Sequence, residues 1–347
     1  MDGSSFLASL LKAVPAGVYY AVQKSRAEAY SAGLWRAEKA PTTVISVGNI
    51  VLGGSGKTPF VIYLTEMMLR RGLKPAVVSR GYRGSNRALH LVVSDGISKE
   101  PLVSPSVSGD EPFLIASRLP GVPVLVGRRR IHPVTAAHKL FASNAVILDD
   151  GFQHLALHRD ADLVLLSGAE DRMFPLGSLR EPLSALERAD IIVTVGETAA
   201  LPPAVNRYVG HTPVFRCNTF PVTVWREGWQ QEPDHFSGQD VVMLSGIAHP
   251  ERFRATADSL GWRVTQHLTF PDHYRITDNE LRAILRSTHQ VPVVVTEKDW
   301  VKLPLWARET GRISALRIGM RTDDEDLFWG ELENLVWSRS AKSASRG

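Results

Sequence analysis

The sequence predicts an α/β protein, with a doubly wound parallel sheet followed by a second, smaller α/β domain. Short apolar runs rich in β-branched residues recur along the chain, and helical stretches separate them. Such runs are typical of parallel strands that are buried on both faces beneath helices. At 347 residues, the chain is long enough for about two domains.

The first domain is expected at residues 31–200, and its strands coincide with six apolar runs, at 44–47, 75–79, 122–126, 144–148, 163–166 and 191–195. Helices between successive parallel strands leave the carboxyl ends of the strands open, and folds of this kind bind their ligands there. We therefore expect the functional residues to follow these runs directly.

The alternation of apolar runs and helical stretches is interrupted in the second half of the chain. Residues 201–239, which include Pro202 and Pro203, are interpreted as an extended or hairpin-like linker rather than helix. A smaller α/β domain is expected at 240–337, with strands near 241–245, 263–267 and 291–295 and helices from about 250 and about 278. The Ser-, Lys- and Arg-rich end, 338–347, is expected to be disordered.

The composition narrows the class of protein. Hydrophobic residues make up 44% and charged residues 22% of the chain, as in ordinary folded proteins. The single cysteine, Cys217, excludes a disulfide framework and a cysteine-rich metal site, which suits a reducing compartment. The net charge of +4 suits anionic ligands, but no RNA-binding or zinc-finger motif occurs. Nucleic acid is therefore not an expected partner, and the sequence indicates no obligate protein partner.

The first 30 residues are predicted to form a membrane-associating helix. Residues 6–22 are mostly apolar, but Lys12 and Pro15 interrupt them, so no uninterrupted apolar span of about 20 residues exists. Basic residues follow the apolar run instead of preceding it, unlike in a signal peptide. We interpret the segment as an amphipathic helix lying on a membrane surface, with Tyr19 and Tyr20 near the headgroups. The alternative is a helix packed on its own domain.

A glycine-rich loop lies between the strand at 43–47 and a helical run at 60–69. Glycines let backbone N–H groups turn toward phosphate oxygens, and the helix N-terminus adds a positive dipole end. Its lysine is placed to reach the β- and γ-phosphates, and its threonine hydroxyl can bind Mg²⁺. The strict pattern has a further glycine where this chain has Val51. The context predicts a P-loop NTPase-like sheet whose nucleotide-binding residues are Gly53, Gly54, Ser55, Gly56, Lys57, Thr58 and Pro59.

Two adjacent acids, Asp149 and Asp150, end the apolar run at 145–148. Nucleotide-binding folds place the carboxylate that holds Mg²⁺, directly or through water, at this position. Adjacent carboxylates near a triphosphate repel each other unless a cation lies between them. Together with Thr58, they are the candidate metal ligands, and an Asp-Asp-Gly turn is the alternative.

Further candidates follow other strands. Asp110 begins a helical run, and taken alone it is best explained as a helix start. Arg80 and Arg83 lie on the expected ligand-facing edge, as an anion site or as an exposed basic turn. Arg180 is a candidate phosphate clamp, and His273, in a loop of the second domain, is a candidate for proton transfer.

Together, and in this order over residues 6–305, the motifs resemble tetraacyldisaccharide 4'-kinase, the lipid A kinase family of Gram-negative bacteria. In that family the residue at Val51 is not glycine either. The segments that carry the resemblance are Val47-Gly48-Asn49 with the glycine-rich loop, Ser79-Arg80-Gly81-Tyr82, Gly109-Asp110-Glu111-Pro112, Asp149-Asp150-Gly151-Phe152-Gln153-His154, Gly177-Ser178-Leu179-Arg180-Glu181-Pro182, Asp272-His273 and Thr296-Glu297-Lys298-Asp299.

The resemblance implies transfer of the ATP γ-phosphoryl group, with Mg²⁺, to the 4'-hydroxyl of a tetraacyldisaccharide 1-phosphate, giving lipid IVA. It also implies a peripheral enzyme on the cytoplasmic face of the inner membrane, with its N-terminal helix against lipid. Lys57 and Thr58 would then contact phosphates and Mg²⁺, and Asp149 with Asp150 would complete the metal site.

The resemblance further pairs Asp110 with His273 as the base that takes the hydroxyl proton. The two residues belong to different domains, so domain closure would assemble them and exclude water. Arg180 would neutralise phosphate charge during transfer. The segment around His273 is short, and His249 and His267 remain alternatives for its role.

Two other functions match part of the sequence. A P-loop GTPase or maturation NTPase would usually show Asp-x-x-Gly, but Phe152 stands three residues after Asp149, and 296–299 does not match the guanine-reading Asn-Lys-x-Asp. A non-catalytic, membrane-bound nucleotide sensor would keep Lys57 and Thr58 without needing a proton acceptor. Neither alternative accounts for the full ordered set of motifs.

Overall fold

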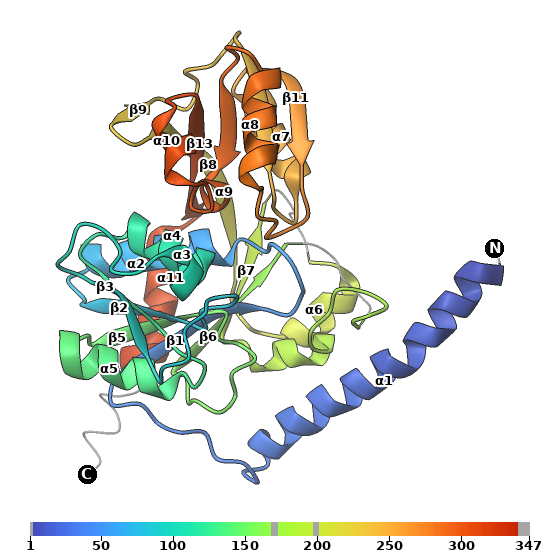
Figure 1. Ribbon diagram of the computed structural model, residues 1–347. Helices are drawn as coiled ribbons and strands as arrows, with labels where there is room; N and C mark the ends of the chain where they lie inside the picture. Colours follow the sequence, from blue (N-terminus) through green and yellow to red (C-terminus); the bar gives the residue numbers. More distant parts are fainter. Residues whose placement is uncertain (1–2, 168–172, 197–200, 339–347) are drawn as a thin grey trace.

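The computed structural model describes residues 3–167, 173–196 and 201–338, and their strands form one continuous mixed sheet (Figure 1). The sheet has 13 strands within these residues, and β9 pairs with β8 beside the main path. The predicted α/β class is therefore confirmed. The order of the strands across the sheet is β11-β10-β12-β13-β8-β7-β6-β1-β5-β2-β4-β3.

The first unit of the sheet is parallel except at its edge, where β3 runs antiparallel to β4. Val47 of β1 lies beside Asp149 of β5, so the ends of these two strands meet at one edge. The sequence did not predict β3. The strands of this unit are β1 (Thr43–Asn49), β2 (Pro75–Ser79), β3 (Leu91–Asp95), β4 (Pro123–Val126), β5 (Ala145–Asp149), β6 (Ala161–Leu166) and β7 (Ile191–Val195).

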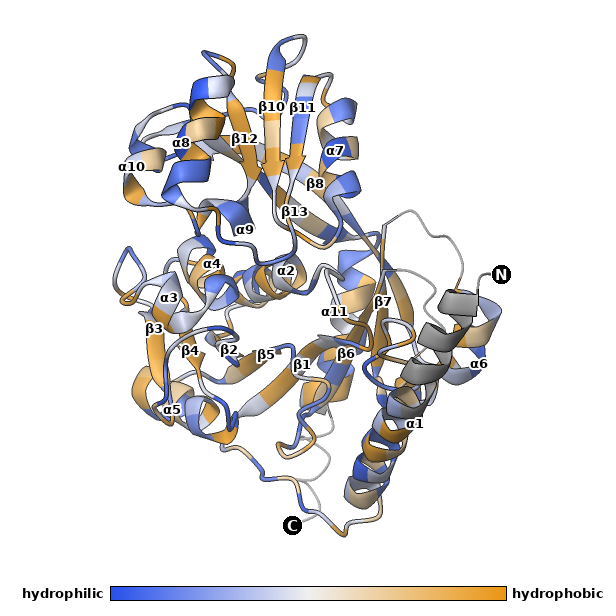
Figure 2. Ribbon diagram, turned by 45° about the vertical axis from the view of Figure 1, so that its right-hand side comes forward, coloured by the Kyte–Doolittle hydropathy of each residue, from blue (hydrophilic) through white to orange (hydrophobic). Residues whose placement is uncertain are grey.

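Helices cover both faces of this unit, as a doubly wound fold requires. Phe60 and Ile115 pack on one face, and Val134 packs on the other. Figure 2 shows the hydrophobic strands enclosed between these helices. These helices are α2 (Lys57–Arg70), α3 (Pro105–Ser108), α4 (Asp110–Arg118), α5 (Ile131–Phe141), the short η1 (Leu183–Arg188) and α6 (Pro203–Val209), and α1 (Gly3–Ser31) precedes them in the chain.

The second unit continues the same sheet and carries its own core between β-strands and helices. Its strands are β8 (Val214–Arg226), β9 (Trp229–Gln231), β10 (Asp240–Ser245), β11 (Arg263–Thr269), β12 (Val293–Thr296) and β13 (Ile313–Thr322). Its helices are α7 (Pro250–Ser259), α8 (Asp278–Ser287), α9 (Glu297–Trp300) and α10 (Leu305–Glu309). The sequence did not predict β13.

Strand β8 belongs to both units. Its first residues pair in parallel with β7, where Val195 lies beside Cys217. From Cys217 onward it pairs antiparallel with β13, whose last residue, Thr322, lies opposite Cys217. After β13 the chain returns to the first unit as α11 (Glu325–Glu333) and η2 (Asn334–Ser338), where Phe328 is fully buried. Residues 339–347 of the expected disordered tail lie outside the described residues.

The stretch 201–239, expected to be extended or hairpin-like, contains α6, β8 and β9. The expectation was wrong at Pro203, which starts α6. Proline favours the first position of a helix, because its fixed φ is already helical and its missing N–H has no partner there. Val205 and Val209 then lie one helical turn apart and are both buried.

Helix α1 extends away from the sheet layers (Figures 1 and 2). Arg26 attaches it to the body by donating to the carbonyl of Gln153 at 3.0 Å, and the Tyr19 ring contacts Phe174 edge-on. Val18 and Val22 are 59% and 56% exposed. Among the described residues, no helix is both long and apolar enough to cross a membrane. The membrane-surface role of this helix stays a prediction.

We predict that Gly48→Ala destabilises the fold by about 1–3 kcal/mol, because an added Cβ would lie 2.5 Å from the Phe152 Cβ. Urea unfolding measures the loss. Gly330→Ala is the matched control: its Cβ would meet nothing within 4 Å, and alanine favours helix over glycine. Equal stability of the Gly48→Ala protein and the wild type would contradict the prediction.

Candidate functional site

The glycine-rich loop joins the end of β1 to the start of α2. Gly53 and Gly56 adopt φ angles of 102° and 82°, in the left-handed region that glycine accepts without strain. The Asn49 amide donates to Ser55 Oγ at 2.8 Å, and Gln153 donates to the carbonyl of Asn49 at 2.8 Å. The loop is therefore fixed from both strands, with the N-terminus of the 14-residue α2 directed into it.

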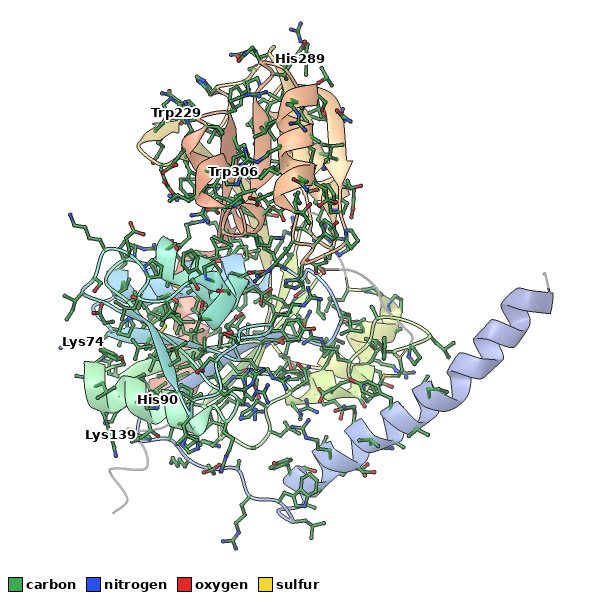
Figure 3. All side chains as sticks on the ribbon, in the orientation of Figure 1. Lys74, His90, Lys139, Trp229, His289 and Trp306 are labelled. Atoms are coloured by element: carbon green, nitrogen blue, oxygen red, sulfur yellow. The ribbon has the colours of Figure 1, made fainter. Side chains whose placement is uncertain are left out.

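A loop of the second unit lies against this glycine-rich loop. A Cβ built on Gly53 or Gly54 would lie 3.6 or 3.4 Å from the Ala248 Cβ, so the small residues leave room for the second unit to approach. Figure 3 shows side chains filling the junction between the two units, with Trp229 and Trp306 labelled in the second and His90 and Lys139 in the first.

Three of the predicted site residues form one ion-paired cluster. Arg180 Nη1 donates to both carboxylate oxygens of Asp150, at 3.0 and 2.8 Å. Lys57 Nζ lies 3.5 Å from Asp150 Oδ1. Burial alone would raise the pKa of Asp150, but the charges of Lys57 and Arg180 outweigh burial and hold this pKa below its usual value. Asp150 is therefore ionised at neutral pH.

Asp149 has the opposite electrostatic character. Its side chain is buried, Ser79 Oγ donates to Oδ2 at 3.0 Å, and Oδ1 has no hydrogen-bond partner among the described residues. Burial, with the charges of Glu111 and Asp150, raises the pKa of Asp149 to about 7. A buried carboxylate with a free oxygen is a fitting ligand for a cation.

The geometry also fits a magnesium ion that takes only some of its ligands from the protein and the others from a bound substrate. The part of the chain that the structure describes contains no cluster of three or more His, Cys, Asp or Glu side chains able to hold a metal. Mg²⁺ commonly uses one or two carboxylates together with nucleotide phosphates and waters. Asp149, Asp150 and Thr58, which is half-buried in the first turn of α2, offer such a partial set.

Asp110 and His273 come from different units and meet at the edge of a cavity of about 410 Å³. His273 Nδ1 lies 3.8 Å from Asp110 Oδ2, and Asp110 Oδ1 has no hydrogen-bond partner within the described residues. Burial would raise the pKa of Asp110, but His273, Lys302 and Arg275 outweigh it and keep this pKa below its usual value. Asp110 is therefore ionised, and its Oδ1, which accepts no hydrogen bond from these residues, lies 3.7 Å from Arg275 Nη2.

The backbone at His273 is held in an uncommon conformation. Its φ is 63°, and its N–H donates to the carbonyl of Gly246 at 3.3 Å. Arg83 of the first unit donates to the His273 carbonyl at 3.2 Å. Non-glycine residues rarely adopt this φ, and such positions cluster at functional sites.

Comparison with known proteins identifies the family. The family model described as LpxK, tetraacyldisaccharide-1-P 4'-kinase, matches residues 7–336. A tetraacyldisaccharide 4'-kinase of Syntrophus aciditrophicus is 37% identical over 327 residues, covering 87% of this chain and 86% of the relative. One from Anaeromyxobacter sp. is 38% identical over 343 residues, covering 94% and 90%.

A solved structure agrees with these relatives. The crystal structure of LpxK from Aquifex aeolicus, described as an "apo" form in complex with ATP, superposes with a TM-score of 0.77 at 29% identity. The match covers 93% of this chain and 97% of the other. This chain belongs to the tetraacyldisaccharide 4'-kinase family.

In this member of the 4'-kinase family, one of the three candidate histidines lies beside Asp110. His249 instead pairs with Glu251, its Nδ1 lying 2.9 Å from Oε1. His267 lies on β11, where its Nε2 is 2.9 Å from Ser245 Oγ. The geometry therefore favours His273 for the role that the sequence left open.

Three residues of the 4'-kinase site received no role from the sequence. The Gln153 side chain donates to the glycine-rich loop, and its backbone carbonyl accepts from Arg26. In the sequence, Gln153 was marked only by its place in the motif 149–154. Glu111 follows Asp110 directly, and it links the two clusters by raising the pKa of Asp149 while pairing with Lys298 at 3.4 Å. No sequence signal pointed to Arg26.

A basic cluster borders the same edge of the sheet. Burial, followed by the nearby charges of Arg130, Arg159, Arg26 and Arg80 in that order, lowers the pKa of His154 to about 4. His154 is therefore neutral at physiological pH. Arg159 pairs with Asp162 at 2.7 Å, so Arg130, Arg26 and Arg80 are the guanidinium groups of this cluster that make the edge attractive to an anion.

We predict that Asp149→Asn stabilises the metal-free protein at pH 8 by roughly 1–3 kcal/mol. The raised pKa means that the folded state holds a proton that the unfolded state loses above about pH 4. The wild type therefore loses stability as the pH rises from about 4 through 7, and the amide avoids this loss. Thermal unfolding between pH 5 and 8 measures the difference, which should shrink toward pH 5.

The same variant tests the metal assignment. Mg²⁺ with ATP should raise the melting temperature of the wild type and have a much smaller effect on Asp149→Asn. A variant that is less stable than the wild type at pH 8 would contradict the raised pKa, and a variant that Mg²⁺ with ATP stabilises as much as the wild type would contradict the metal assignment.

Proposed function

We propose that this chain transfers the γ-phosphoryl group of ATP to the 4'-hydroxyl of a tetraacyldisaccharide 1-phosphate, giving lipid IVA in lipid A biosynthesis. Membership of the family supports the reaction. The observation that carries it is the meeting of Asp110 and His273 across the two units, in the same junction as the phosphate loop. A GTPase or a nucleotide sensor has no use for this arrangement.

The phosphate loop binds the ATP triphosphate through backbone N–H groups and through Lys57. In the structure Lys57 and Arg180 are both paired with Asp150. ATP brings new anionic oxygens between these groups, so Lys57 can exchange the carboxylate for the β- and γ-phosphates. Arg180 stays near enough to stabilise charge on the transferred group.

Asp149, Asp150 and Thr58 are the residues that would hold Mg²⁺. The buried, unpartnered Oδ1 of Asp149 supports a direct contact from that residue. When bound, Mg²⁺ neutralises charge on the β- and γ-phosphate oxygens.

Asp110 accepts the proton of the sugar hydroxyl. Its low pKa makes it a weak base, and a weak base is sufficient because phosphoryl transfer passes through a loose transition state in which the hydroxyl loses its proton late. Asp110 and His273 both line the cavity, and Asp110 Oδ1 accepts no hydrogen bond within the described part of the chain, although Arg275 Nη2 lies 3.7 Å from it. His273 orients the carboxylate from the other side.

The acceptor carries a phosphate of its own, and the arginine cluster around His154 offers the matching charge. Arg26 of this cluster lies on α1, so the helix that we propose to lie on the membrane also reaches the site. We propose that the enzyme works as a peripheral protein on the cytoplasmic face of the inner membrane.

The reaction is tested by incubating the purified chain with ³²P-labelled ATP, Mg²⁺ and a tetraacyldisaccharide 1-phosphate in mixed micelles. We expect label to appear in the lipid, with ATP preferred over GTP. Rapid ATP turnover without labelled lipid would contradict the assignment.

Asp110→Asn should lower kcat for lipid labelling by about 10²-fold or more, while the Kd for ATP stays within about twofold. The amide keeps the shape of the helix start and removes the base, so it separates catalysis from capping. Asp110→Ala removes both. If Asp110→Asn matches the wild type and only Asp110→Ala loses activity, Asp110 has the structural role alone.

A further inference from the structure

Lys298 lies at the centre of the contacts between the two units. It follows β12 in the short helix α9, and its ammonium group lies 3.2 Å from Asp272 Oδ1 and 3.4 Å from Glu111 Oε1. Its Nζ also lies 3.3 Å from His273 Nε2. Burial would lower the pKa of Lys298, but Glu111 and Asp272 outweigh burial and raise it, so the group is charged.

The contact with Lys298 fixes which nitrogen of His273 can carry a proton. An ammonium group has three donors and no acceptor, so the nitrogen it contacts has to supply a lone pair. His273 Nε2 is that nitrogen, and a neutral imidazole then carries its proton on Nδ1. Nδ1 is the nitrogen that faces Asp110 Oδ2 at 3.8 Å.

The other groups around His273 show why this selection is needed. Asp272 Oδ2 lies 3.8 Å from Nε2 and by itself favours a proton there. Asp110 favours a proton on Nδ1. The imidazole thus lies between two carboxylates with opposite preferences, and Lys298 neutralises the one at Nε2. The Tyr82 ring lies edge-on to the imidazole and does not add a charge.

We propose that Lys298 is a positioning residue that holds His273 in the Nδ1–H tautomer directed at Asp110. The proposal rests on the proposed function, in which Asp110 takes the hydroxyl proton. An Nδ1–H donor at Oδ2 fixes the carboxylate and leaves Oδ1 to accept. Lys298 also pairs with Glu111, the neighbour of Asp110, so the residue that selects the tautomer contacts the first unit as well.

The tautomer is measured directly by two-bond ¹H–¹⁵N correlation spectra of the full chain labelled with ¹⁵N-histidine. The His273 signals are assigned by their loss in His273→Gln. We expect an unprotonated Nε2 and a protonated Nδ1 in the wild type at pH 8. In Lys298→Met, Asp272 should draw the proton to Nε2, and Lys298→Arg should restore the wild-type pattern.

Kinetics give a second readout. Lys298→Met should lower kcat for lipid labelling about 10²-fold, with the KM for ATP within about twofold of the wild type, and Lys298→Arg should recover most of the loss. The matched control is Arg118→Met, which removes another contact between the units, the 2.6 Å pair with Glu297, without touching His273. It should keep the Nδ1–H tautomer.

The outcomes separate the two proposals. A wild-type His273 protonated on Nε2, or an unchanged tautomer in Lys298→Met, overturns the role of Lys298. A wild-type chain that labels no lipid overturns the proposed function, while the spectra still decide the tautomer. If Lys298→Met does not fold, the wild-type spectrum decides alone, and Asp272→Asn, which keeps Lys298, should retain the proton on Nδ1.

Discussion

The pairing of β8 with β7 on one side and β13 on the other is the constraint on which the site depends. Cys217 is the point where the pairing changes from one strand to the other. The chain crosses the junction on β8, builds the second unit, and returns on β13 to bury Phe328 in the first core. Two hydrogen-bonded strands therefore set the distance and direction between the loop that carries His273 and the helix that begins at Asp110.

This arrangement brings many carboxylates together. Parallel strands end at one edge, so β5 delivers Asp149 and Asp150 beside the phosphate loop, and α4 adds Asp110 and Glu111. Negative charges that lie this close together need positive partners, and the described part of the protein provides such partners for Asp150 but not for Asp149. Lys57 and Arg180 neutralise Asp150, whereas Asp149 keeps a free buried oxygen and a pKa raised to about 7. A bound cation would provide the positive charge that Asp149 lacks.

The sequence predicted the features that depend on residues close together in the chain. The glycine-rich loop, the helix that follows it and the position of Asp149 at the end of β5 follow from short-range patterns of strand, turn and helix, although α2 begins at Lys57, three residues before the predicted run at 60–69. The family resemblance added the pairing of Asp110 with His273 of the second unit.

What the sequence missed depends on contacts between distant parts of the chain. Strand β13 and its pairing with β8 have no local signal that separates them from a linker or an edge segment. The choice among the three histidines was equally inaccessible, because it depends on which loop of the second unit lies opposite α4. Lys298 was visible as part of a motif, but its contact with His273 exists only once β12 and the loop at 271–275 are placed side by side.

The distance between Asp110 and His273 indicates how much movement the site still needs. At 3.8 Å the pair is about 1 Å longer than a charge-assisted hydrogen bond. Ion pairs from Lys298 to Glu111 and from Arg118 to Glu297 already join the units on either side. A relative shift of about 1 Å would bring the pair to hydrogen-bond distance. Under the proposed function, an acceptor that contacts both units would supply this shift and so assemble its own base.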